Sequence, residues 1–161
     1  MAEIHGSPRA PRQRRVAVLV SRYNEIVTQR LLEGARACLR DKGVPDARVD
    51  VLWLPGAFEL PVAAEAVAAS GRYAAVVALG CVIRGETPHF EYVAGEAARG
   101  LGNVALAHRL PVGFGVLTTE TLAQAQARAG GAAGDKGYEA AEAALATADV
   151  LARLSGAAPR D

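Results

Sequence analysis

Short apolar runs alternate with longer amphipathic stretches along the chain, and this alternation constrains the fold more than any other feature of the sequence. The apolar runs occupy residues 16–20, 49–54, 74–79 and 111–117. A continuous apolar run such as residues 16–20 is typical of a strand that is buried on both faces of a parallel sheet, and we expect residues 74–79 to form the most buried strand. The spacing of apolar residues predicts helices over residues 24–41, 58–69, 88–108, about 121–129 and 136–154.

Strands that alternate with helices form a parallel sheet with right-handed crossovers and helices on both faces. We therefore predict an α/β protein, a single three-layer α/β/α sandwich of the flavodoxin-like type with a four-stranded parallel sheet. The length of 161 residues fits one domain. A hydrophobic fraction of 51% argues against intrinsic disorder, and no apolar run is long enough to span a membrane.

The first 14 residues differ in charge from the rest of the chain. Four arginines and one glutamate give residues 1–15 a charge of +3, so the other residues together carry −2 within the overall +1. Two prolines interrupt residues 1–14, which we expect to be a basic, disordered leader before a folded domain over residues 15–161. We expect neither nucleic acid nor a membrane as a partner. The chain start lacks a secretory signal and two cysteines form no disulfide framework, so we expect a cytoplasmic protein.

Polar and aromatic residues follow each predicted strand. They are Ser21 to Asn24, Pro55 to Glu59, Cys81 to Glu91, and Thr118 to Glu120. Ligands of open parallel sheets bind beyond the carboxyl ends of the strands. We therefore expect these loops to meet at one edge of the sheet and to form the ligand site.

The loop after the third strand carries the strongest signal. Thr87 followed by Pro88 predicts an N-cap and a first-turn proline, so a helix would begin there with free backbone N–H groups. Next to Gly85, such a helix start is suited to binding a phosphate or another anion. His89 would lie in the first turn, where an imidazole can transfer protons near neutral pH. The alternative is that His89 only packs at the helix start.

The residues give no signal for a metal or an organic cofactor, and we expect neither. Cys81 has no second cysteine or nearby histidine at metal-ligand spacing. The glycines of residues 100–102 follow a helix rather than a strand, which argues against a dinucleotide site. Arg128 and Lys136 flank a glycine-rich turn, where two cations either are solvated or clamp a phosphate.

Several ordered blocks of the sequence resemble the 6,7-dimethyl-8-ribityllumazine synthase family. Residues 80–93, GCVIRGETPHFEYV, closely resemble its signature loop. Residues 55–61, 114–120 and 128–137 resemble further blocks in the family's order, and residues 21–24 look like its first block. The resemblance covers about residues 15–151, which is nearly the whole predicted domain.

The resemblance implies an enzyme of riboflavin biosynthesis. It would condense 5-amino-6-(D-ribitylamino)uracil with 3,4-dihydroxy-2-butanone 4-phosphate to the lumazine, releasing phosphate and water without a cofactor. His89 would move protons, and Gly85, Glu86, Thr87 and Arg128 would bind the phosphate. The residues implied to bind the uracil and its ribityl chain are Tyr23, Asn24, Gly56, Ala57, Phe58, Glu59, Cys81, Val82, Ile83, Phe114 and Lys136.

The chain departs from the family pattern at two of these places. Tyr23 stands where the family usually has Phe or Trp, which keeps the aromatic face and adds a hydroxyl. Ala127 stands where many members carry an acidic residue before the arginine, so Arg128 would lose one partner. The first departure concerns affinity and the second concerns how firmly Arg128 is held; neither changes the reaction that the resemblance implies.

The resemblance also implies a homo-oligomer. In the family, Phe114, Arg128 and Lys136 come from a neighbouring subunit, so the site is complete only in a pentamer. The compact turn over residues 130–135 favours further assembly into a shell of sixty subunits, with the pentamer alone as the alternative. A non-catalytic protein that binds flavins or lumazines, or a cage-forming scaffold, is the alternative function. Retention of His89, Arg128 and Lys136 together argues against the former, since a protein that only binds needs no group to move protons.

Overall fold

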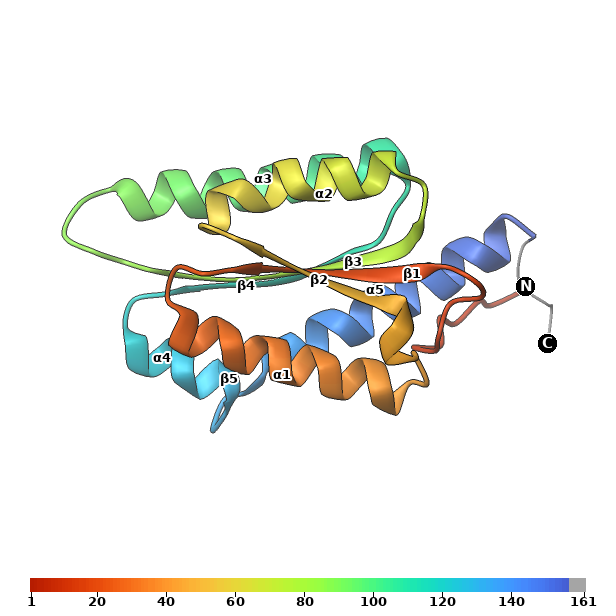
Figure 1. Ribbon diagram of the computed structural model, residues 1–161, viewed down its shortest axis with the longest axis horizontal. Coiled ribbons are helices and arrows are strands. Elements are labelled where there is room, and N and C mark those ends of the chain that lie inside the picture. Colours follow the sequence, from red (N-terminus) through yellow and green to blue (C-terminus); the bar gives the residue numbers. More distant parts are fainter. Residues whose placement is uncertain (157–161) are drawn as a thin grey trace.

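The computed structural model describes residues 1–156 and confirms the predicted three-layer sandwich. Four strands form a parallel sheet between two layers of helices (Figure 1). Their spatial order is β2-β1-β3-β4, and each neighbouring pair is parallel. The strands are β1 (Arg15–Ser21), β2 (Val49–Leu54), β3 (Tyr73–Ile83) and β4 (Val112–Thr119).

The strand order decides which face each helix covers. From β1 the chain runs outward to β2 and then returns past β1 to β3. The crossovers β1 to β2 and β2 to β3 are both right-handed but run in opposite directions, so their helices lie on opposite faces of the sheet. One face is covered by α1 (Glu25–Asp41), α4 (Leu122–Arg128) and α5 (Lys136–Leu154), the other by α2 (Leu60–Ala69) and α3 (His89–His108) (Figure 1).

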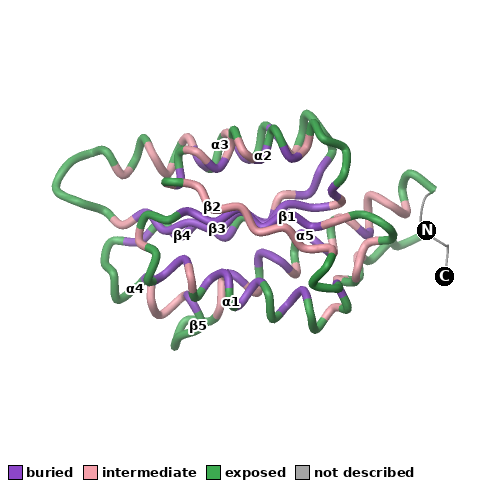
Figure 2. The backbone as a smooth tube through the Cα atoms, viewed as in Figure 1, coloured by how far each residue is buried: buried purple, intermediate pink, exposed green. Residues whose placement is uncertain are grey.

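The two central strands form the core, as their apolar sequences predict. Residues 16–20 of β1 and residues 75–79 of β3 have no exposed surface, and Figure 2 shows this buried layer between the two helical layers. Their side chains point alternately to the two faces, so successive residues of a strand belong to two separate apolar clusters. One cluster packs under α1 and α5 and the other under α2 and α3.

Several predicted boundaries were wrong by a few residues. The third strand continues to Ile83 instead of ending near residue 79, because β4 pairs with it as far as Thr119. The second helix begins as a 3-10 turn over Ala57–Glu59. The glycine-rich turn forms a small antiparallel ribbon of β5 (Ala129–Gly131) and β6 (Gly134–Asp135). A further 3-10 turn over Asp46–Arg48 precedes β2.

The leader contains no helix or strand, yet part of it is held against the folded body. The backbone N–H of Ser7 and the guanidinium of Arg9 both donate to the carboxylate of Asp149 on α5, at 3.0 and 2.9 Å. The N–H of Ala10 donates to the Lys42 carbonyl at the end of α1. Residues 7–10 of the predicted leader therefore contact the folded body, where the nearly buried carboxylate of Asp149 anchors them.

Candidate functional site

The carboxyl ends of the four strands meet at the end of the sheet that lies on the left in Figure 1. The order β2-β1-β3 makes the gap between β1 and β3 the point where successive connections leave in opposite directions. Ligands of open α/β sheets bind at such a switch point because the diverging loops leave a crevice there. The loops of residues 21–24 and 55–59 begin at this edge, and so does the third loop, which the structure confines to residues 84–88 within the predicted range 81–91.

A hydrogen bond ties the first loop to the end of β3 across this switch point. Asn24 has the left-handed backbone conformation, with φ of 59°, and occupies the position before α1. Its side-chain amide donates to the carbonyl oxygen of Cys81 on β3 at 2.9 Å. The amide nitrogen is therefore committed to the Cys81 carbonyl, and the side-chain oxygen of Asn24 can accept a hydrogen bond from a ligand.

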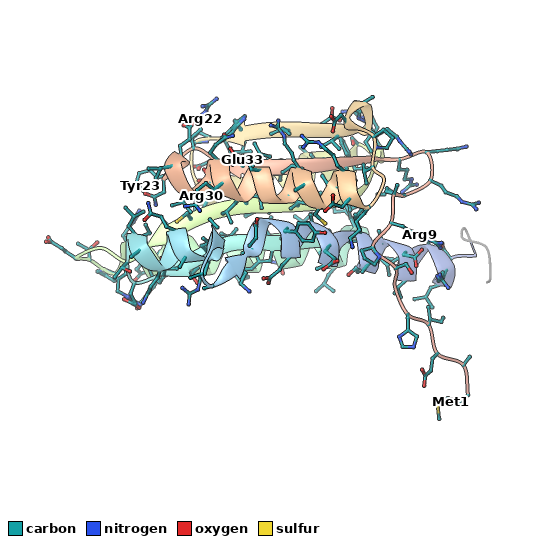
Figure 3. All side chains as sticks on the ribbon, turned by 90° about the horizontal axis from the view of Figure 1, so that it is seen from below. Met1, Arg9, Arg22, Tyr23, Arg30 and Glu33 are labelled. Carbon is teal, nitrogen blue, oxygen red and sulfur yellow. The ribbon has the colours of Figure 1, made fainter. Side chains whose placement is uncertain are left out.

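Tyr23 presents an aromatic ring at the same edge. The residue is 72% exposed, and Figure 3 shows it beyond the start of α1. The N–H groups of Arg22 and Tyr23 donate to the carbonyls of Leu54 and Pro55, which fixes the first loop against the second. The guanidinium of Arg22 lies over the Trp53 ring, 5.2 Å from its centre. An exposed ring on an anchored backbone can stack on a planar ligand with little loss of conformational entropy.

The second loop contributes a mixture of buried and exposed residues. Ala57 is buried beneath the loop, whereas Phe58 is 58% exposed. A Cβ added to Gly56 would lie 3.0 Å from a carboxylate oxygen of Glu59, so this carboxylate turns back toward the loop. Glu59 is partly exposed and can accept hydrogen bonds from the hydroxyl groups of a ligand.

The third loop differs in detail from the prediction. The helix begins at His89 with Pro88 in the capping position, and Thr87 makes no capping hydrogen bond. The predicted cap at Thr87 was therefore wrong by one residue. Residues 84–89 are all exposed, and a Cβ on Gly85 would meet nothing within 4 Å. The open loop and the first turn of α3 thus leave room for an anion near His89.

The end of β3 separates the loop from the core. Cys81 and Val82 are buried and Ile83 is partly buried, so their backbones rather than long side chains border the edge. Burial raises the pKa of the Cys81 thiol to about 11. A thiol with this pKa is almost entirely protonated at neutral pH, which argues against a nucleophilic role.

Three predicted site residues are not brought to this edge by contacts within the chain. Phe114 lies early in β4, opposite Ala78, and lines a groove of about 190 Å³ with side chains of α3. Arg128 donates to the Gln124 carbonyl of its own helix, and the Lys136 ammonium pairs with Glu139 at 2.6 Å. Among residues 1–156, no hydrogen bond or ion pair joins Arg128 or Lys136 to the third loop.

The structure adds a charged cluster that the sequence interpretation left without a role. Arg84 pairs with Glu120 beyond β4 and with Glu91 in the first turn of α3, at 2.9 and 3.3 Å. Its guanidinium also lies over the Phe90 ring, 4.6 Å from the centre. The hydrogen bond to Glu120, and then that to Glu91, raises the pKa of Arg84. An acidic residue seven positions after Arg84 and another after β4 were the only sequence signals for this cluster.

Comparison with known proteins decides the family. The model of the 6,7-dimethyl-8-ribityllumazine synthase family matches residues 13–152. The chain belongs to this family. It is 54% identical to the 6,7-dimethyl-8-ribityllumazine synthase of Gemmatimonas aurantiaca over 153 residues, which are 95% of this chain and 93% of that protein. It is 55% identical to the synthase of Edwardsiella ictaluri over 152 residues, 94% of this chain and 97% of that protein.

No group of three or more His, Cys, Asp or Glu side chains within residues 1–156 is arranged to hold a metal ion. None of the helices in that range combines the length and the apolar character that crossing a membrane requires. The chemical groups at the edge of this lumazine synthase fold are an imidazole, backbone amides, carboxylates, guanidinium groups and aromatic rings.

Proposed function

We propose that this chain is an enzyme that condenses 5-amino-6-(D-ribitylamino)uracil with 3,4-dihydroxy-2-butanone 4-phosphate to 6,7-dimethyl-8-ribityllumazine. The supporting observation is the signature segment, residues 80–93, which runs from the end of β3 into α3 at the switch point of the sheet. The chain that carries this segment belongs to the lumazine synthase family. The reaction belongs to riboflavin biosynthesis. We also place it in the cytoplasm, and the two cysteines support this because both are free, buried thiols.

The proposed mechanism needs two substrates held side by side and a group that moves protons. The amine of the uracil attacks the ketone and water leaves to form an imine, phosphate is eliminated, and ring closure releases a second water. Holding both substrates in one geometry can supply much of the rate acceleration. His89, exposed at the first turn of α3, is our candidate for carrying protons between the reacting nitrogen and oxygen atoms.

We assign the uracil to the side of the site near β1 and β2. The ring of Tyr23 would stack on the pyrimidine, and Asn24 and Glu59 would bind the ribityl hydroxyls. The exposure of Tyr23 and the orientation of the other two residues support this assignment. Gly56, Ala57 and Phe58 would border the ribityl chain, and the backbones of Cys81, Val82 and Ile83 would meet the edge of the pyrimidine.

We assign the phosphate to the open part of the third loop. Backbone N–H groups of Gly85, Glu86 and Thr87, next to the start of a 20-residue helix, form a suitable anion site. Arg128 would complete it with a bidentate contact. The carboxylate of Glu86 would point away from the phosphate, because a like charge beside a dianion is unfavourable.

We further propose that the working form is a pentamer in which a neighbouring subunit supplies Phe114, Arg128 and Lys136. The placement of these residues away from the third loop of the same chain supports this. The compact β5–β6 ribbon favours assembly of pentamers into a shell of sixty subunits. Light scattering and electron microscopy would separate the two forms, and a particle of only five subunits would contradict the shell.

The function is tested by mixing the purified protein with both substrates and following the absorbance and fluorescence of the lumazine. The uncatalysed rate is subtracted. Two variants of the same helix form a matched pair: His89→Gln at its start and His108→Gln at its end, where His108 pairs with Glu65. We expect His89→Gln to lower kcat by roughly 10- to 100-fold, since positioning is the larger effect, and His108→Gln to leave kcat within about threefold.

Two results would contradict this assignment. Tight binding of the lumazine without any acceleration by the wild-type protein would make the chain a binding or scaffold protein. Equal losses in the two histidine variants would show that the loss does not depend on the position of His89 in the site.

A further inference from the structure

Arg84 is the first residue of the third loop, and its side chain pairs with two carboxylates beside that loop. Taking the proposed function as its basis, we propose that Arg84 is a positioning residue that keeps the phosphate loop receptive to a dianion by neutralising Glu91 and Glu120. Arg84 touches neither reacting group in this proposal. It acts through the two carboxylates and through the loop that it begins.

The contacts of Arg84 join three segments that the sequence keeps apart. Its backbone N–H donates to the Thr119 carbonyl at the end of β4, at 2.9 Å. Its Nε donates to the Glu120 carboxylate, and its Nη1 donates to the Glu91 carboxylate. The flat face of the guanidinium rests over Phe90. Arg84 thus connects the end of β3, the end of β4 and the first turn of α3.

The charges of Glu91 and Glu120 matter because both residues adjoin the proposed phosphate loop and His89. Glu91 is two residues after His89 and lies in the first turn of α3, and Glu120 follows the last residue of β4. The side chains of both glutamates are more than 60% exposed, whereas that of Arg84 is 38% exposed. The two carboxylates therefore flank a loop that would bind a phosphate carrying up to two negative charges.

Without Arg84, two uncompensated carboxylates would repel that phosphate. An ammonium or guanidinium at this place lowers the repulsion because each carboxylate then shares its charge with a cation within 3.3 Å. Exposed ion pairs of this kind are individually weak. Loss of both at once should weaken binding of the phosphate substrate by roughly 5- to 20-fold, while the uracil, which carries no phosphate, should be little affected.

The test compares Arg84→Gln with three further variants in the full-length protein. Arg84→Gln should raise KM for the phosphate substrate by roughly 5- to 20-fold, with kcat and KM for the uracil within about threefold. Arg84→Lys keeps the charge and should recover most of the loss. Arg84→Gln combined with Glu91→Gln and Glu120→Gln should bring KM back to within about threefold of the wild type. Arg99→Gln, which removes another ion pair of α3, is the control and should change nothing.

A second readout keeps this test independent of the proposed function. Binding of inorganic phosphate, measured by calorimetry, should weaken in Arg84→Gln and recover in the triple variant, whether or not the wild type makes the lumazine. Unchanged phosphate binding and KM in Arg84→Gln would overturn the proposal. So would a triple variant as weak as Arg84→Gln, or a loss that affects kcat and both KM values equally. Wild-type protein without activity would instead contradict the function and leave the phosphate measurement to decide the role of Arg84.

Discussion

The crossing of α1 and α5 depends on a missing side chain at Gly137. A Cβ added there would lie 2.0 Å from the Leu31 carbonyl oxygen and 2.7 Å from its carbon, both of which belong to the backbone of α1. The backbone of a packed helix cannot rotate out of the way as a flexible side chain can. Gly137→Ala therefore requires the two helices to separate by more than an ångström along their contact.

The expected loss follows from that separation. A gap of 0.5–1 Å removes roughly a quarter to a half of the dispersion energy of each contact across an interface. This contact includes Leu31 and Leu145, which are almost completely buried. Overpacking of this kind costs about 1–3 kcal/mol, and we place Gly137→Ala at about 3 kcal/mol because the obstacle is backbone. In a protein of this size that corresponds to a melting temperature lower by roughly 6–12 °C.

A matched substitution on α3 has the opposite expected sign. Gly95 is exposed, lies inside the helix, and a Cβ there would meet nothing within 4 Å. Gly95→Ala should stabilise the protein by about 0.5–1 kcal/mol, because glycine is a poor helix former. Both variants are compared with the wild type by denaturant unfolding followed by circular dichroism, at one subunit concentration. If Gly137→Ala unfolds within about 0.5 kcal/mol of the wild type, the steric reasoning is refuted.

Three further predictions follow from single residues. Arg128→Ala should raise KM for the phosphate substrate at least tenfold more than KM for the uracil, as measured by steady-state kinetics. Equal effects on the two KM values would remove Arg128 from the phosphate site. Burial alone would raise the pKa of Asp149, but hydrogen bonds from Ser7, Arg9 and Arg153 overcome it and hold the pKa below its ordinary value. The carboxylate therefore stabilises the fold above pH about 4 and loses this effect as pH falls through its lowered pKa. Asp149→Asn should cost about 1–2 kcal/mol at pH 7 and progressively less as the pH falls below about 4, and a cost that does not change with pH would contradict the ion pairing. Burial raises the pKa of Cys38 and of Cys81 to about 11. A disulfide reagent at pH 8 should therefore label these thiols only after unfolding. Rapid labelling of the native protein would show instead that the thiols are accessible.

Local sequence patterns identified the layers of this protein well. The residues of β1, β3 and the long helices follow directly from apolar periodicity, because a strand buried on both faces needs a continuous apolar run. Boundaries were less certain where pairing with a partner strand decides the end, as at Ile83, whose place in β3 depends on Thr119 of β4. The β5–β6 ribbon was also missed, since glycine-rich segments carry no apolar pattern.

The sequence by itself determined the fold class and the residues of the core through its apolar pattern. It also determined the family, through the blocks around His89 and Gly56. Tertiary structure decided which groups meet. It brought the Asn24 amide to the Cys81 carbonyl, placed Arg84 between Glu91 and Glu120, and held Arg9 against Asp149. These pairs are between 7 and 140 residues apart in the chain, and all but the pair of Arg84 with Glu91 span at least 36. Periodicity reports only the environment of one segment, so contacts between distant segments appear only when the sheet order and the crossovers are known.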